Sequence, residues 1–96
     1  MVWLHAGELG VLGKEMTLGR TSSEELILRR FGEHLRRLRK LRGLTQDELA
    51  TQAGFSRTYY TEIEKGKRNV SILNLCKLAE CLGIKVTELL EFDASD

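Results

Sequence analysis

Residues 45–64, TQDELATQAGFSRTYYTEIE, carry two helix-start signals on either side of one glycine. Thr45 and Glu48 have the spacing of a capping box, in which two side chains bond free backbone amides of a helix's first turn. Gly54 is predicted to end this helix, and Ser56 is predicted to begin a second helix that runs to the end of the stretch. Two short capped helices joined by a turn around a glycine form a helix-turn-helix layout.

A long amphipathic helix is predicted before this stretch. Ser22 and Glu25 form another capping box, and apolar residues follow at helical spacing. These apolar residues are Leu28, Phe31, Leu35 and Leu38. Gly43 is expected to end the helix in the left-handed conformation, with Leu44 closing the apolar contact of the cap.

Two more helices are predicted after the stretch. Ser71 begins the first, which ends at Gly83, and Thr87 begins a short final helix. The predicted core face of the first consists of Ile72, Leu75, Leu78, Ala79 and Leu82. Residues 22–93 are therefore expected to form one all-α domain of five helices. Residues 1–21, which are rich in glycine and lack a helical period, are predicted to be an N-terminal arm, and residues 94–96 a short acidic tail.

The charge is distributed unevenly, although the net charge of the 96 residues is only +1. Residues 29–45 hold one acid, Glu33, and seven basic residues. The basic residues are Arg29, Arg30, Arg36, Arg37, Arg39, Lys40 and Arg42. Residues 71–96 hold two lysines and five acids. A basic end suits a nucleic-acid partner, and the alternative is an ordinary solvated helix face.

The sequence lacks the residue patterns that an enzyme, a metal site or a membrane-spanning segment would need. His5 and His34 are isolated, and no pair of carboxylates or Cys-His couple stands at catalytic spacing. Cys76 and Cys81 are five residues apart, so on a helix they point about 140° away from each other. We therefore expect no cofactor, no metal, no small-molecule substrate and two reduced thiols. No apolar run is long enough to cross a membrane, and we expect a cytoplasmic protein.

The outer face of the second short helix carries candidate base-reading residues. Tyr60 and Ile63 fall on its inner side, and the opposite side holds Thr58, Thr61, Glu62 and Lys65, with Arg57 at its edge. Arg57 can donate two hydrogen bonds to guanine, Thr58 can offer its methyl group to thymine, and Glu62 can accept from cytosine. The alternative is an exposed helix face without a ligand.

Candidate phosphate-binding residues flank this helix. Thr45 and Gln46 lie where the preceding helix begins, and free backbone amides there favour an anion. The loop after the helix is basic and can contact the flanking DNA backbone. Its candidates are Lys65, Lys67, Arg68 and Asn69. A solvated loop is the alternative.

Residues 38–84 resemble the helix-turn-helix family of the phage lambda and 434 repressors and Cro, the XRE family. The motif Leu-Thr-Gln-x-x-Leu-Ala, then Gly, then Ile-Glu-x-Gly carries the resemblance. Within that family the segments at 57–59 (Arg-Thr-Tyr) and 68–71 (Arg-Asn-x-Ser) are most similar to restriction-modification controller proteins. The resemblance implies a five-helix DNA-binding domain.

The resemblance also implies roles for individual residues. It places Arg39 and Glu64 at the positions of a structural ion pair and Gln46 at that of a phosphate-contacting glutamine. It makes Tyr59 a contact to the DNA backbone. It also matches four residues of the second short helix to base-reading positions, namely Arg57, Thr58, Thr61 and Glu62. Tyr60 departs from the pattern, because an aliphatic residue is usual there.

A homodimer is expected, because one domain presents too few base-reading groups to select an operator. Similar proteins dimerise through a C-terminal apolar cluster, which here is Val86, Leu89, Leu90 and Phe92. The alternative is that this cluster only closes the core of a monomer. Two copies related by two-fold symmetry would read half-sites about 34 Å apart in a near-palindromic operator.

Two functional hypotheses follow. The first is a sequence-specific regulator of transcription that binds double-stranded DNA, of the controller type. The second is an antitoxin, in which residues 1–20 fold around a partner toxin.

Overall fold

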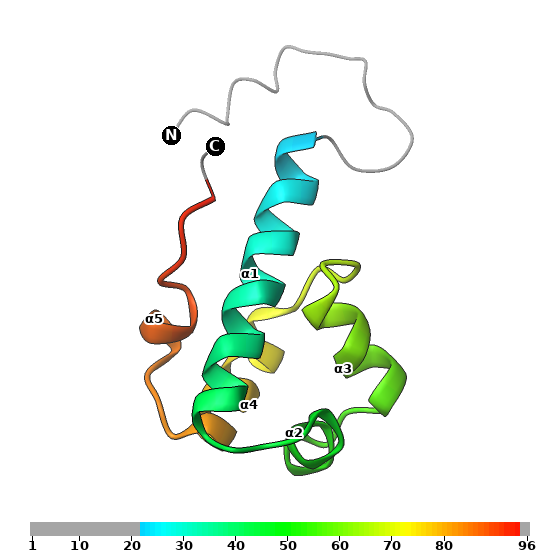
Figure 1. The fold of residues 1–96 in the computed structure, drawn as a ribbon, viewed down its shortest axis with the longest axis vertical. Coiled ribbons are helices and arrows are strands. Elements are labelled where there is room, and N and C mark those ends of the chain that lie inside the picture. The colour runs from blue at the N-terminus through cyan, green and yellow to red at the C-terminus, as the bar shows by residue number, and fades with distance from the viewer. Residues whose placement is uncertain (1–21, 95–96) are drawn as a thin grey trace.

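The computed structural model describes residues 22–94, which form helices joined by short turns. Its helices are α1 (Ser22–Leu41), α2 (Gln46–Ala53), α3 (Arg57–Glu64), α4 (Ile72–Leu82) and α5 (Val86–Leu89). The long helix α1 runs between α5 on one side and α3 on the other, with α2 near its C-terminal end (Figure 1). Residues 22–94 contain no strand, and the predicted all-α, five-helix fold is confirmed.

The predicted signals around the turn between α2 and α3 are present. Thr45 Oγ1 accepts a hydrogen bond from the amide of Glu48 (3.0 Å), and Glu48 Oε1 accepts one from the amide of Thr45 (2.8 Å). Gly54 adopts a φ of 77°, which favours glycine. Ser56 Oγ then accepts from the amide of Tyr59 (3.1 Å) and begins α3. These caps place the start of α3 immediately after the end of α2.

Three details of the sequence prediction are wrong or untested. Ser22 is already part of the helix, so it is not the cap of α1 as predicted. The predicted arm, residues 1–21, and residues 95–96 lie outside the described residues and stay untested. Ile72 is 71% exposed, because the first turn of α4 extends beyond the core. Thr87 lies inside α5, which begins after Lys85; the amide of Lys85 donates to Glu88 Oε1 at 2.9 Å.

The hydrophobic core lies between α1, the α2–α3 pair and α4. Its buried side chains are Phe31, Leu35, Leu49, Ala50, Ala53, Tyr60, Ile63, Leu78, Ala79, Leu82 and Leu89. Every helix contributes at least one of them, so α2 and α3 are held by the whole domain. None of the helices in the described part of the chain is long and apolar enough to cross a membrane.

Helix α1 packs directly against the C-terminal end of α3 at Gly32. A Cβ atom on Gly32 would lie 2.4 Å from the carbonyl oxygen of Glu64 and 2.6 Å from that of Ile63. Gly66, just after α3, has a φ of 77° and would place a Cβ 2.8 Å from the Cα of Arg29. Glycine at these two positions therefore lets the two backbones approach, which the sequence reasoning missed.

We expect Gly32→Ala to destabilise the domain by about 1–3 kcal/mol, because the new methyl group meets backbone carbonyls that cannot rotate away. Urea unfolding followed by circular dichroism measures this change. Glu33→Ala, at an exposed neighbouring position, is the control and should change the free energy of unfolding by less than about 0.5 kcal/mol. Alanine favours a helix over glycine by about 1 kcal/mol, so a Gly32→Ala protein more stable than the wild type would contradict the close packing.

Candidate nucleic-acid interface

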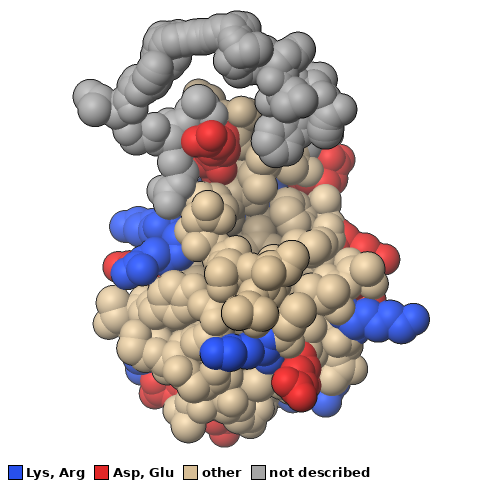
Figure 2. All heavy atoms as spheres, turned by 180° about the vertical axis from the view of Figure 1, so that it is seen from behind, with Lys and Arg blue, Asp and Glu red and all other residues tan. Residues whose placement is uncertain are grey.

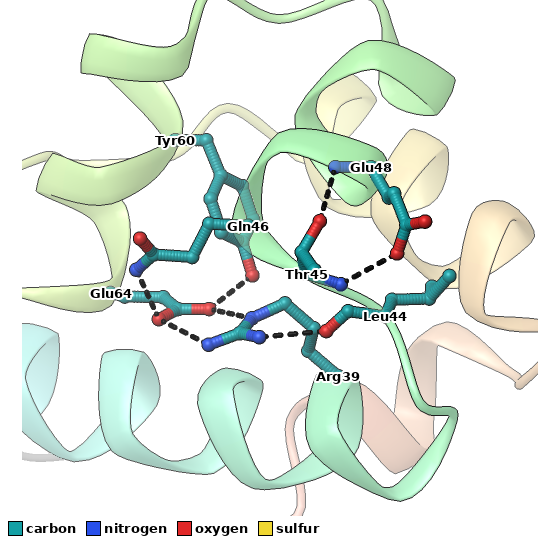
Figure 3. A network of polar contacts seen from close by, with 7 residues as sticks. All are labelled: Arg39, Leu44, Thr45, Gln46, Glu48, Tyr60 and Glu64. Carbon is teal, nitrogen blue, oxygen red and sulfur yellow. Dashed lines mark hydrogen bonds and ion pairs between the residues drawn. The ribbon is translucent and has the colours of Figure 1, made fainter.

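A buried ion pair connects α1 to the end of α3. The side chains of Arg39 and Glu64 are 8% and 3% exposed, and Arg39 Nε donates to Glu64 Oε2 at 2.7 Å. Arg39 Nη2 donates to the other carboxylate oxygen at 3.3 Å, and Nη1 donates to the carbonyl of Leu44 at 2.7 Å (Figure 3). One guanidinium thus fixes the end of α3 and the turn that precedes α2.

Two further donors complete the surroundings of Glu64. Gln46 Nε2 donates to Oε1 at 2.9 Å, and the hydroxyl of Tyr60 donates to Oε2 (Figure 3). The Tyr60 ring is fully buried, so its hydroxyl needs a partner inside the protein. Tyrosine is therefore accommodated at this position because the carboxylate lies within reach, and the turn before α3 keeps its glycine-capped geometry.

The pKa values of these groups follow from burial and from the shared hydrogen bonds. Burial alone would raise the pKa of Glu64, but hydrogen bonds from Arg39, Tyr60 and Gln46 outweigh it and hold the pKa below the ordinary 4.5. The hydrogen bond to Glu64 raises the pKa of Arg39. Burial, and then the hydrogen bond to Glu64, raises the pKa of Tyr60. Glu64 is thus ionised at neutral pH.

We expect Glu64→Gln to cost about 3–5 kcal/mol at neutral pH, because it leaves the Arg39 charge buried without a counter-charge. The folded-state pKa of Glu64 is lowered, so its contribution is complete above about pH 4.5 and is lost as the pH falls through the folded-state value. The difference in unfolding free energy between the two proteins should therefore shrink below that pH.

Chemical denaturation over an acidic pH series measures this difference. Glu33→Gln removes an exposed carboxylate that lies 3.9 Å from Arg30, and it should change stability by less than about 1 kcal/mol. Equal unfolding free energies for wild type and Glu64→Gln at neutral pH would show that the ion pair does not stabilise the fold.

The outer face of α3 presents the four candidate base-reading residues away from the core. Arg57 and Thr58 are exposed, and Thr61 and Glu62 are half-buried, whereas Tyr60 faces inward. Thr61 Oγ1 donates to the carbonyl of Thr58 at 3.1 Å. The two charged residues have partners outside α3. Arg57 pairs with Asp47 of α2 at 2.9 Å, and Glu62 pairs with Arg68 of the following loop at 2.8 Å.

Tyr59 lies among residues from three segments. Its ring meets Phe55 edge-on at 5.1 Å between centroids, and the Arg68 guanidinium lies 5.3 Å from the ring centroid. Asn74 Nδ2 donates to the Tyr59 hydroxyl at 2.9 Å. The aromatic partner of Phe55 is therefore Tyr59, the third residue of α3. These contacts join α3, the basic loop and α4.

An open depression of about 570 Å³ lies at the start of α2. Thr45 and Gln46 line it together with the basic residues Arg36 and Lys40 of α1 and Arg57 of α3. On the face opposite to that of Figure 1, Lys and Arg side chains lie at both edges and low on the face beside an acidic side chain, and the centre is largely uncharged (Figure 2). Lys65, Lys67, Arg68 and Asn69 are exposed after α3.

Comparison with known proteins assigns this arrangement to a family. The helix-turn-helix family model HTH_3 matches residues 35–89, more than half of the chain. The chain belongs to this helix-turn-helix family. Membership confirms the predicted family, and it confirms that the chain is a regulator of this class and not an enzyme.

The helix-turn-helix domain is similar to controller proteins in particular. The control protein C.MunI of a Mycoplasma species is 51% identical over 61 residues, which cover 62% of this chain and 82% of C.MunI. The crystal structure of the restriction-modification controller protein C.AhdI from Aeromonas hydrophila has a TM-score of 0.63 at 47% identity and covers 65% of this chain and 94% of that one.

A third relative is known with its ligand. The structure of the biofilm regulator SinR in complex with DNA has a TM-score of 0.61 at 34% identity, and the match covers 64% of this chain and 98% of the SinR chain in that structure. The helix-turn-helix region is therefore shared with a protein whose structure contains DNA.

The C-terminal cluster of this helix-turn-helix protein is divided between core and surface. Leu89 is fully buried in the core, so it cannot offer surface to a second copy, contrary to the prediction. Leu90 is 46% exposed, and Val86 and Phe92 are half-buried. The Phe92 ring lies 5.9 Å from that of Phe31, between centroids.

Sequence reasoning missed two polar residues of the helix-turn-helix surface. Asp47 lies ten positions before its partner Arg57, and Asn74 lies fifteen positions after Tyr59. Neither spacing is a helical repeat, so only the packing of α2 and α4 against α3 reveals these contacts. The antitoxin hypothesis depended on residues 1–20, which lie outside the described residues.

Proposed function

We propose that this chain is a sequence-specific regulator of transcription that inserts α3 into the major groove of double-stranded DNA. The observation that carries the proposal is the division of α3 into two faces. Tyr60, Ile63 and Glu64 anchor the helix inside the domain, and the opposite face presents polar groups to solvent. A helix held so firmly can present those groups in one fixed geometry, which base recognition requires.

The groups on that face match the hydrogen-bonding pattern of base edges. The guanidinium of Arg57 suits guanine, the methyl group of Thr58 suits thymine, and the carboxylate of Glu62 suits the amino group of cytosine. Thr61 lies one turn after Thr58 and completes the base-reading set. Arg57 is in the first turn of α3, the part of such a helix that reaches deepest into the groove.

The flanking residues would bind the DNA backbone. Thr45 and Gln46 begin α2, and Lys65, Lys67, Arg68 and Asn69 follow α3, so phosphates on both sides of α3 have partners. Tyr59, whose hydroxyl accepts from Asn74, is the seventh proposed backbone contact. These contacts set the register and the salt dependence of binding but not the choice of bases.

Arg57→Ala and Arg68→Ala test the division between base reading and phosphate anchoring. Arg57→Ala should cost about 1–3 kcal/mol of binding and relax the preference at one base pair. Arg68→Ala should weaken binding to all sequences and reduce the salt slope by at most about one, because Glu62 already offsets part of the Arg68 charge. Fluorescence anisotropy on a duplex selected from a random library, with single-base variants and a salt series, measures both. Two variants with the same profile would contradict the division.

We further propose that the protein acts as a homodimer on a near-palindromic operator in the cytoplasm, as a restriction-modification controller protein. Support comes from the similarity to C.MunI and C.AhdI and from the exposed side chain of Leu90 beside Val86 and Phe92. One domain offers few base contacts, whereas a two-fold pair doubles them. Mapping the bound site upstream of the chain's own gene would test the controller role.

Leu90→Asp should convert a dimer into a monomer, because it places a charge in an apolar interface. Sedimentation velocity at micromolar concentration measures the state. Leu41→Asp, at an 81% exposed position on α1, is the matched control and should remain dimeric. A wild-type protein that sediments as a monomer, or a Leu90→Asp protein that stays dimeric, would exclude this interface.

A further inference from the structure

Asp47 is an acidic residue among basic ones, on the surface that we propose faces the DNA backbone. It is the second residue of α2 and lines the depression formed with Arg36, Lys40 and Arg57. Among the described residues that line this depression, Asp47 is the only acid. A carboxylate next to DNA phosphates weakens binding, so its presence here calls for a gain elsewhere.

The contact between Asp47 and Arg57 restricts the arginine in a particular way. Arg57 Nη1 lies 2.9 Å from Asp47 Oδ1 and 3.0 Å from Oδ2, so one nitrogen meets both carboxylate oxygens. This leaves the edge formed by Nε and Nη2 for another acceptor. Two parallel donors on one edge are what a guanine needs, because its O6 and N7 accept side by side in the major groove.

We propose that Asp47 is a specificity-determining residue, which orients Arg57 for guanine and disfavours DNA that lacks this base at the right position. The inference rests on the proposed function, since it assigns Asp47 a role in choosing the DNA site. Asp47 touches no base itself and acts through Arg57, so it is a positioning residue.

The charges explain why the effect differs between DNA sequences. While paired with Asp47, Arg57 adds little net attraction for phosphates, so non-specific binding gains little from it. Guanine O6 and N7 are uncharged acceptors, and they can bind the Nε–Nη2 edge while the ion pair stays intact. Both side chains are well exposed, at 59% for Arg57 and 64% for Asp47, so the effect should be a few-fold.

Asp47→Asn tests the inference by removing the charge and keeping the shape. Wild type first selects a duplex from a random double-stranded library, and dissociation constants are then measured for that duplex and for a scrambled duplex of equal composition. Asp47→Asn should bind the scrambled duplex more tightly, with a salt slope steeper by about one. The ratio of the two dissociation constants should fall about fivefold.

A matched control removes the same charge elsewhere. Glu25 is exposed in the first turn of α1, about 22 Å along the helix from Lys40. Glu25→Gln should leave the ratio unchanged; an equal loss of selectivity in this variant would mean that net charge alone acts and would overturn the inference. Asp47→Glu keeps the charge and should retain most of the selectivity.

Two further results separate the inference from the function on which it rests. If wild type enriches no sequence, the proposed function fails and the inference fails with it. If wild type enriches a sequence and Asp47→Asn keeps the full ratio, the function stands and the role of Asp47 is refuted. Asp47→Ser, with a residue suited to a helix start, repeats the test should Asp47→Asn not fold.

Discussion

The buried ion pair between Arg39 and Glu64 determines where α3 lies. Either charge alone would be costly to bury. Moving α1 away from α3 would therefore leave Arg39 or Glu64 buried without its counter-charge. The carboxylate also accepts from Tyr60 and Gln46, and the guanidinium also donates to the carbonyl of Leu44. The two charges therefore fix α1, the start of α2 and the end of α3 as one unit.

Charge pairing on the outer surface works differently. The contacts of Arg57 with Asp47 and of Glu62 with Arg68 are exposed and individually weak, and the Arg57 pair leaves one edge of the guanidinium available to a ligand. The inner pair supplies a rigid support, and the outer pairs hold the reading side chains ready without fixing them permanently. Together they give α3 a polar, solvent-facing surface on a firmly anchored backbone.

The sequence predicted the parts of the fold that local chemistry determines. The capping box at Thr45, the left-handed turn at Gly54 and the cap at Ser56 depend on neighbours only a few residues away, and they are present. The role of Gly32, the exposure of Ile72 and the pairing of Asp47 depend on which helices come together. Helical periodicity cannot supply that, because it assigns a face without saying how far the core extends along it.

The separation of the two faces of α3 has a consequence for how binding preference can change. Tyr60, Ile63 and Glu64 carry the folding interactions, whereas Arg57 and Thr58 are exposed and carry almost none. Mutations at the outward positions should therefore be tolerated by the fold, so related lineages could acquire new target sites while keeping the same scaffold. Selection would then act on recognition and stability almost independently.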